Sequence, residues 1–166
     1  VIGGGDWSKD RLIPDCVKAW SKNKPVKIRN LSSTRPWQHV IEVINGYLEL
    51  ALKLNNKKKN INGESFNFGP STNKNYKVED CLREMKKNWP DIKWNKEKKT
   101  NRFKEAGLLK LDSKKSLKYL NWKTIMPFNE TIKFTSEWYK NFYNNKAKII
   151  TVNQIKRYYQ KFNINI

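Results

Sequence analysis

Short apolar runs alternate along this chain with longer segments whose apolar residues recur at helical spacing. The spacing over 13–20 predicts a helix, and the alternation over 25–29 predicts a short strand. The same criteria predict further helices over 40–54, 78–85, 113–120, 129–142 and 151–162, and short strands at 1–2, 65–68 and 92–94. Because strands alternate with helices, the sequence places the chain in the α/β class.

The composition indicates a folded domain with a strongly basic surface. Hydrophobic residues make up 37% of the 166 residues and aromatic residues 13%, which argues against disorder. The net charge is +20, but 29 of the 35 basic residues are lysines, whereas nucleic-acid sites favour arginine. We therefore favour a solvated basic face over a specific nucleic-acid site. Charges also break every apolar run before membrane-spanning length, so we expect no membrane partner.

The cysteines and the single histidine argue against a metal site. Cys16 and Cys81 have no metal-binding spacing and make no disulfide framework, and both fall in apolar helical patterns, so we expect buried, reduced thiols. His39 is the only imidazole, which excludes a histidine-rich site. No nucleophile stands beside His39, so a hydrogen-bonded structural role is favoured over general-base catalysis.

The glycine-rich start of the chain does not match a dinucleotide-binding loop. Gly3–Gly5 follows a short apolar strand, but Ser8 stands where the third glycine of the fingerprint would fall, so we expect no cofactor-binding residue here. Arg11 lies just before a predicted helix start, where a guanidinium and free N–H groups favour an anion. The alternative is a surface arginine paired with Asp10 or Asp15.

A second arginine stands in a stiffer setting. Pro36 restricts Arg35 to an extended backbone, and a rigidly held guanidinium suits bidentate recognition of phosphate. The alternative is an arginine at a helix start that is bonded to a nearby carboxylate. Asn67 lies at the end of a predicted strand, where α/β proteins bind ligands, although a turn asparagine is as reasonable.

One apparent motif is interpreted as a coincidence. Tyr119 and Lys123 have the Tyr-x-x-x-Lys spacing of short-chain dehydrogenases, in which both side chains must lie on one helix face. Asp112 can cap the preceding helix, and Asn121 is predicted to end it in a left-handed turn. The two side chains are therefore not expected to act together, and no catalytic residue is predicted in this chain.

Several segments together resemble the CDP-glucose 4,6-dehydratases, which are extended short-chain dehydrogenase/reductases. The resemblance is carried by Val1–Trp7, Asp10–Asp15, Ile28–Asn30, Thr34–Val40, Gly46–Leu48, Phe66–Pro70, Glu105–Ala106 with Leu111–Asp112, Trp138–Tyr139 and Gln154–Ile155. It implies an α/β fold made of the C-terminal substrate-binding half, with the end of the Rossmann sheet and a small mixed α/β lobe. Residues 1–166 would be the nucleotide-sugar-binding part, without the N-terminal NAD-binding part.

The resemblance also implies an activity for the full-length enzyme. Such enzymes use tightly bound NAD to convert CDP-glucose to CDP-4-keto-6-deoxy-glucose and water, a step toward the deoxy sugars of the O-antigen of lipopolysaccharide. It further implies a cytoplasmic homo-oligomer when the chain is full length, and a fragment that is inactive alone. Two alternatives stay open: another nucleotide-sugar dehydratase or epimerase, and a basic nucleic-acid-binding protein.

The resemblance assigns substrate-binding roles residue by residue. Arg35 corresponds to the arginine that grips the diphosphate, and Arg11, Leu12 and Ile13 to the segment along the nucleotide. Asn67 and Glu105 fall in pocket-lining motifs. Arg102 is placed where it could reach a phosphate. The chain departs from the family pattern at Lys104, where a histidine is usual, and at Asn121, where a glycine is usual.

Overall fold

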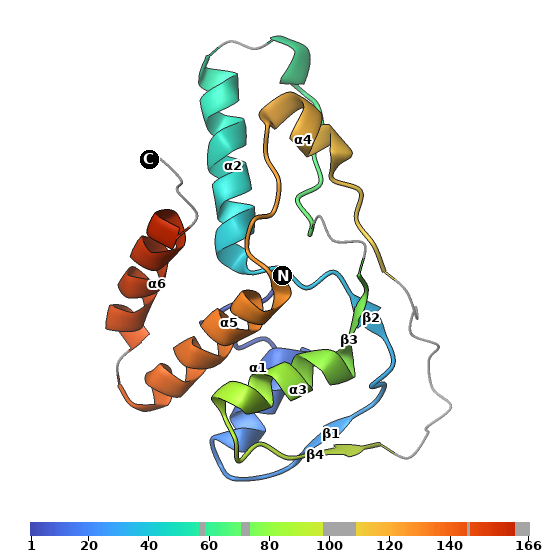
Figure 1. The fold of residues 1–166 in the computed structure, drawn as a ribbon, viewed down its shortest axis with the longest axis vertical. Coiled ribbons are helices and arrows are strands. Elements are labelled where there is room, and N and C mark those ends of the chain that lie inside the picture. The colour runs from blue at the N-terminus through green and yellow to red at the C-terminus, as the bar shows by residue number, and fades with distance from the viewer. Residues whose placement is uncertain (57–58, 71–73, 98–108, 146, 162–166) are drawn as a thin grey trace.

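The computed structural model describes residues 1–56, 59–70, 74–97, 109–145 and 147–161. Figure 1 shows their arrangement. The helices are α1 (Leu12–Trp20), α2 (Val40–Asn55), η1 (Lys59–Ile61), α3 (Val78–Asn88), α4 (Lys114–Leu120), α5 (Phe128–Tyr143) and α6 (Ala147–Lys161). The strands are β1 (Val26–Ile28), β2 (Thr34–Arg35), β3 (Tyr76–Lys77) and β4 (Trp94–Lys96).

Two small sheets connect segments that are far apart in the sequence. β1 pairs with β4 in parallel, with Val26 opposite Trp94, and β2 pairs with β3 in antiparallel fashion, with Arg35 opposite Tyr76. A single parallel bridge joins Ile2 to His39. The predicted α/β class is confirmed, and the parallel pair brings the carboxyl ends of β1 and β4 to one edge.

The lower part of the molecule in Figure 1 holds the main core. Apolar faces of α1, α3 and α5 pack together beside the β1–β4 sheet, with Cys16, Cys81, Leu82, Met85 and Ile132 at their centre. Both cysteines are free and buried, as predicted. Burial raises the pKa of each thiol well above its ordinary value, so both stay protonated.

The upper part is a smaller lobe that α2 and α4 form around a second apolar cluster. Phe68 packs edge-on against Trp122, with ring centroids 4.9 Å apart. Gly46 lets α2 approach this cluster, because a Cβ atom there would lie 2.4 Å from the Phe68 ring. Asn121 ends α4 with φ of 57°, which confirms the predicted left-handed stop.

A buried carboxylate ties the two parts together. Glu42 in α2 accepts hydrogen bonds from the N–H groups of Ile125 (3.2 Å) and Met126 (2.7 Å), in the segment that leads into α5. Burial raises the pKa of Glu42, while these hydrogen bonds and one with Tyr158 of α6 oppose the rise. The backbone before α5 is therefore held by the start of α2.

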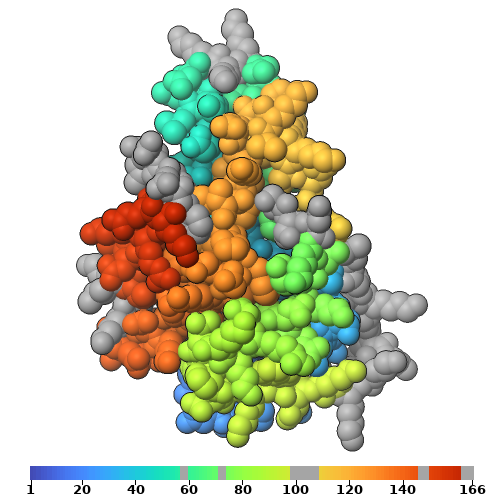
Figure 2. Space-filling view, viewed as in Figure 1, coloured from blue at the N-terminus to red at the C-terminus, as the bar shows by residue number. Residues whose placement is uncertain are grey.

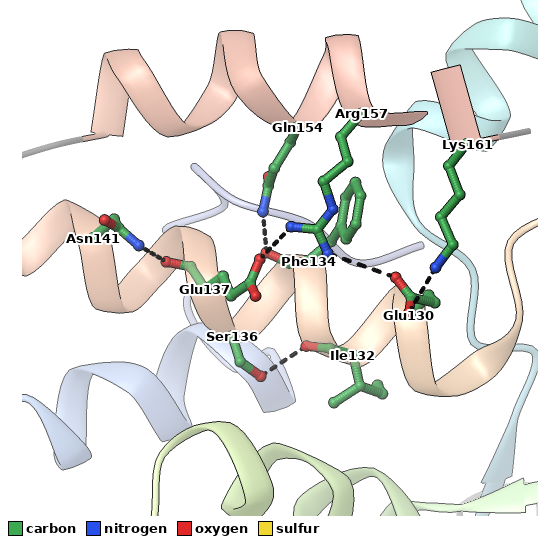
Figure 3. A network of polar contacts seen from close by, with 9 residues as sticks. All are labelled: Glu130, Ile132, Phe134, Ser136, Glu137, Asn141, Gln154, Arg157 and Lys161. Atoms are coloured by element: carbon green, nitrogen blue, oxygen red, sulfur yellow. Dashed lines mark hydrogen bonds and ion pairs between the residues drawn. The ribbon is translucent and has the colours of Figure 1, made fainter. Parts of the chain in front are cut away.

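α6 is fastened to α5 by charged and amide side chains. Figure 2 shows α6 lying alongside α5 at the surface, and Figure 3 shows the contacts. Arg157 reaches Glu137 at 3.3 Å and Glu130 at 3.8 Å, and it stacks on the Phe134 ring at 4.7 Å. The buried Gln154 donates to the Phe134 carbonyl at 2.7 Å.

Two local predictions were wrong. Residues 65–68 form no strand: the Asn67 carbonyl accepts from the Ser116 hydroxyl, and Gly69 N–H donates to the Ser113 hydroxyl at 2.8 Å. Ser113, the N-cap of α4, and Ser116 within α4 thus take up backbone groups that a neighbouring strand would use. The start of the helix predicted over 129–142, which Asn129 would cap, is also wrong, because α5 begins at Phe128 and Pro127 is its N-cap.

Candidate functional site

A cavity of about 780 Å³ opens between the first fifteen residues, β1 and β2. A cavity of this size can hold a ligand as large as a nucleotide. Its charged lining is mixed, with more cations than anions: Lys9, Arg11, Lys27, Arg29 and Arg35 face Asp6, Asp10, Asp15 and Glu97. The excess of cations, and the arginines in particular, favour an anionic ligand.

Arg35 is mounted on a rigid piece of backbone. It belongs to β2 and pairs with Tyr76 of β3, while its Nη1 donates to the Thr34 carbonyl at 2.8 Å. The Trp37 indole N–H donates to the Tyr76 carbonyl at 3.0 Å, which holds the chain on the far side of Pro36. The guanidinium is therefore presented from a fixed base, as bidentate phosphate recognition requires.

Arg35 also forms part of the wall between two cavities. Residues 35–37 line the large cavity and a second one of about 260 Å³, which Tyr76 and Phe128 also line. The rings of Tyr76 and Phe128 are stacked, with centroids 3.8 Å apart. This stacking stiffens the wall that carries the guanidinium.

The segment 11–13 enters the large cavity from another direction. Arg11 is the N-cap of α1, with an extended backbone (φ −111°, ψ 135°), and its side chain makes no capping bond. Leu12 and Ile13 form the first helical turn, so their N–H groups have no partner within the helix. Arg11 thus stands beside the positive end of α1, an arrangement that favours an anion.

Two polar residues at the sheet edge were missed by sequence reasoning. Arg29 directly follows β1, and Glu97 directly follows β4; both line the large cavity. The Glu97 N–H donates to the Ile28 carbonyl at 2.9 Å, which extends the pairing of the two strands. Arg29 ends one predicted strand and Glu97 follows another, and this position was a sequence signal for them, since α/β proteins bind ligands at the carboxyl ends of parallel strands.

The remaining predicted site residues are not brought to this cavity. Asn67 is exposed, donates to the Asp112 carbonyl at 3.3 Å, and does not line the cavity. Arg102 and Glu105 lie outside the described residues. The structure therefore brings together Arg11, Leu12, Ile13 and Arg35 of the seven predicted residues.

His39 has a structural setting. Its Nδ1 accepts from the Ile41 N–H at 3.3 Å and so caps α2, while its ring lies edge-on to Phe134. The other ring nitrogen is buried and has no hydrogen-bond partner among the residues that the structure describes. Burial lowers the pKa of His39 to about 4, so the ring is neutral at pH 7.

The glycines near the start make room for packing and not for a phosphate. A Cβ atom on Gly3 would lie 2.6 Å from Val40, and one on Gly4 would fall within the Trp138 ring, 1.9 Å from its nearest carbon. A dinucleotide loop leaves that space for a pyrophosphate. These residues therefore do not fit the pyrophosphate of NAD.

The described part of the chain offers neither a helical Tyr-Lys pair nor a metal site. α4 ends at Leu120, so Lys123 lies beyond the helix that carries Tyr119. No group of three histidine, cysteine, aspartate or glutamate side chains there could hold a metal ion. None of its helices is long and apolar enough to cross a membrane.

The fold matches that of nucleotide-sugar epimerases and dehydratases. A UDP-glucuronic acid 4-epimerase from Bacillus cereus, solved with UDP-glucuronic acid and NAD, gives a TM-score of 0.66 at 21% identity, over 80% of this chain and 40% of its own. A dTDP-glucose 4,6-dehydratase from Bacillus anthracis, solved with NAD, gives 0.61 at 17% identity, over 80% and 39%. The chain therefore has the fold of part of an extended short-chain dehydrogenase/reductase.

A curated relative shows which of these enzymes the chain resembles in sequence. The CDP-glucose 4,6-dehydratase of Salmonella typhimurium is 38% identical to this chain over 151 residues, which are 90% of this chain and 42% of the relative. No family model matches the chain. The predicted resemblance to CDP-glucose 4,6-dehydratase is confirmed, and this chain spans about two fifths of that relative's length.

Proposed function

We propose that this chain is the nucleotide-sugar-binding part of a CDP-glucose 4,6-dehydratase, a lyase that converts CDP-glucose to CDP-4-keto-6-deoxy-glucose and water. One observation carries the proposal. Arg11 and Arg35, from two separate segments, line one cavity in a chain that is 38% identical to such an enzyme. Two arginines that converge on a nucleotide-sized cavity suit a diphosphate.

In this proposal each residue has a defined task. Arg35 binds the diphosphate from its fixed strand, and Arg11 adds a second cation next to the free N–H groups of α1. Leu12 and Ile13 cover an apolar face of the nucleotide. Asn67, Arg102 and Glu105 stay predictions, to be tested by substitution in the full-length enzyme.

In a complete enzyme, bound NAD would supply hydride-transfer chemistry at the sugar. Gly3 and Gly4 do not fit the dinucleotide, so we assign no redox step to the residues of this chain. We further propose that the 166-residue chain has no dehydratase activity alone, and that the complete enzyme is a cytoplasmic homo-oligomer that serves O-antigen synthesis. Formation of the keto sugar by the purified chain with CDP-glucose and NAD would contradict the first of these statements.

A second candidate is supported by the structural neighbours, whose names include enzymes of UDP- and dTDP-sugars. Direct binding separates the candidates. The purified chain is titrated calorimetrically with CDP, UDP, dTDP and cytidine. We expect CDP to bind best, and cytidine to bind about 10- to 100-fold more weakly, because it offers no charge-assisted bonds to the arginines.

The same titration distinguishes the two candidate functions and tests the diphosphate site. Tighter binding of UDP or dTDP than of CDP would favour the second candidate. No detectable CDP binding, or equal binding of cytidine and CDP, would overturn the proposed diphosphate site. A parallel titration with duplex DNA tests the basic surface: weak binding that disappears with added salt is expected, and tight, sequence-selective binding would favour a nucleic-acid-binding protein.

A further inference from the structure

Glu97 is a carboxylate in a cavity that otherwise favours anions. It follows β4 directly, it is half-buried, and it lines the large cavity together with Arg29 at the neighbouring strand end. Its backbone is fixed by the 2.9 Å hydrogen bond from its N–H to the Ile28 carbonyl. The side chain is therefore carried on a sheet edge rather than on a free loop.

The Glu97 carboxylate makes no hydrogen bond and no ion pair within the described part of the chain. The other acidic residues of the cavity are in different settings. Asp6 accepts from the Ser8 N–H at 2.9 Å, Asp10 is exposed, and Asp15 lies in the first turn of α1. The Glu97 carboxylate is thus an acceptor at the cavity wall that is open to a hydrogen-bond donor of a ligand.

The chemistry of pyrimidines determines which ligand can supply them. Cytosine carries an exocyclic amino group at C4, which donates hydrogen bonds, and carboxylates accept from this group. Uracil and thymine carry an oxygen at C4, which would repel a carboxylate. With the phosphates at the arginines, the hydroxyls and the base of the ligand are left to meet an acceptor, and the 4-amino group is the donor that distinguishes cytosine from uracil and thymine.

We propose that Glu97 accepts a hydrogen bond from the 4-amino group of cytosine and thereby selects cytidine over uridine and thymidine nucleotides. This inference rests on the proposed function, because it assumes that a nucleoside diphosphate occupies the large cavity. Arg35 and Arg11 then determine how tightly a diphosphate binds, whereas Glu97 determines which base is preferred.

The test measures calorimetric affinities of the purified chain for CDP and UDP. The wild-type chain is expected to prefer CDP by about 10- to 100-fold, the range for one good base contact. Glu97→Gln is expected to reduce this preference at least about tenfold, because the amide can also donate to the uracil oxygen. Glu84→Gln, on α3 in an ion pair with Lys87, is the matched control and keeps the wild-type preference.

A ligand-side measurement avoids dependence on how well the variant folds. Pyrimidin-2-one riboside 5′-diphosphate lacks only the 4-amino group. The wild-type chain is expected to bind it about tenfold or more weakly than CDP, whereas Glu97→Gln should show a clearly smaller difference.

These experiments distinguish failure of the role of Glu97 from failure of the proposed function. Binding of CDP that is equal to that of UDP or of the pyrimidin-2-one analogue, or an unchanged preference in Glu97→Gln, overturns the role of Glu97 and leaves the diphosphate site intact. Failure of the wild-type chain to bind either diphosphate overturns the proposed function, and the inference with it. Arg35→Ala serves as a reference, because it should weaken CDP and UDP by the same factor.

Discussion

Arg35 lies opposite Tyr76 in the two-residue antiparallel sheet, and the carbonyl of Tyr76 also accepts the indole N–H of Trp37 at 3.0 Å. One residue of β3 thus holds the backbone on both sides of Pro36. The proline fixes its own φ and restricts Arg35, so the backbone that carries the guanidinium loses little conformational entropy when a ligand binds. The rigidity that the sequence predicts from Pro36 is therefore reinforced by a contact between distant segments.

The first prediction concerns Arg35 itself. Arg35→Ala should weaken CDP binding about 10- to 100-fold, because a charged hydrogen-bonding group contributes about 1.5–3 kcal/mol. Calorimetry on the purified chain measures the change. Arg83→Ala is the control, since Arg83 is exposed on α3 and pairs with Glu79 at 2.7 Å, away from the cavity. Equal affinities of the two variants would exclude Arg35 from the site.

The second prediction concerns the pH dependence of stability. Burial lowers the pKa of His39 from 6.5 to about 4, so between these pH values the unfolded chain binds more protons than the folded chain. The free energy of unfolding should therefore rise with pH across this window, by about 3 kcal/mol in total from this group.

His39→Asn isolates the contribution of the imidazole. Asparagine is a good N-cap and can still accept from the Ile41 N–H, but it does not titrate. Denaturant unfolding at several pH values from 4 to 7 should show a shallower rise for the variant. If the curves for both proteins run parallel, the buried neutral state of His39 is incorrect.

The third prediction concerns Glu42. Glu42→Ala leaves the N–H groups of Ile125 and Met126 without their acceptor, and it should lower the free energy of unfolding by about 2–4 kcal/mol. Glu49→Ala, on the same helix, should change it by less than about 0.5 kcal/mol. Denaturant melts of the two variants under the same buffer make the comparison; similar losses would show that helix α2, and not the carboxylate, is responsible.

The fourth prediction separates the two kinds of contact in Figure 3. Arg157→Ala removes two ion pairs of a side chain that is 40% exposed, together with its stacking on Phe134, and we expect a loss of only about 0.5–1 kcal/mol. Gln154→Ala removes a buried side chain and its hydrogen bond to the Phe134 carbonyl, which keeps its intrahelical donor, and should cost about 1–2 kcal/mol. Thermal unfolding compares the stability of the two variants. A larger loss for Arg157→Ala would mean that the contacts of Arg157 contribute more to holding α6 against α5.

Local sequence signals predicted the helices well and the strand pairing poorly. The apolar spacing placed α1 and α2 within one residue at each end, because these helices bury one face against a core. β2 and β3 were missed because two-residue strands that lie forty residues apart carry no periodicity. The strand predicted at 65–68 was wrong because Ser113 and Ser116 bind its backbone, a contact that no local pattern contains.

The candidate site was predictable where backbone stiffness showed in the sequence. Pro36 indicated that Arg35 is held rigidly, and the predicted helix start indicated that Arg11 stands where an anion is favoured. Arg29 and Glu97 carried no comparable mark, because their importance comes from the parallel pairing of β1 and β4. Asn67 was predicted to lie at the end of a strand, but residues 65–68 form no strand.

The left-handed turn at Asn121 decides how this chain should be compared with enzymes that use a tyrosine and a lysine four residues apart. Tyr119 and Lys123 have the spacing of that motif, but the left-handed backbone at Asn121 ends the helix between them. A search that matches only the sequence pattern will therefore assign proton-transfer chemistry to a segment whose helix ends between the two residues. Fold-aware filters should require an uninterrupted helix between the two positions before such an assignment is made.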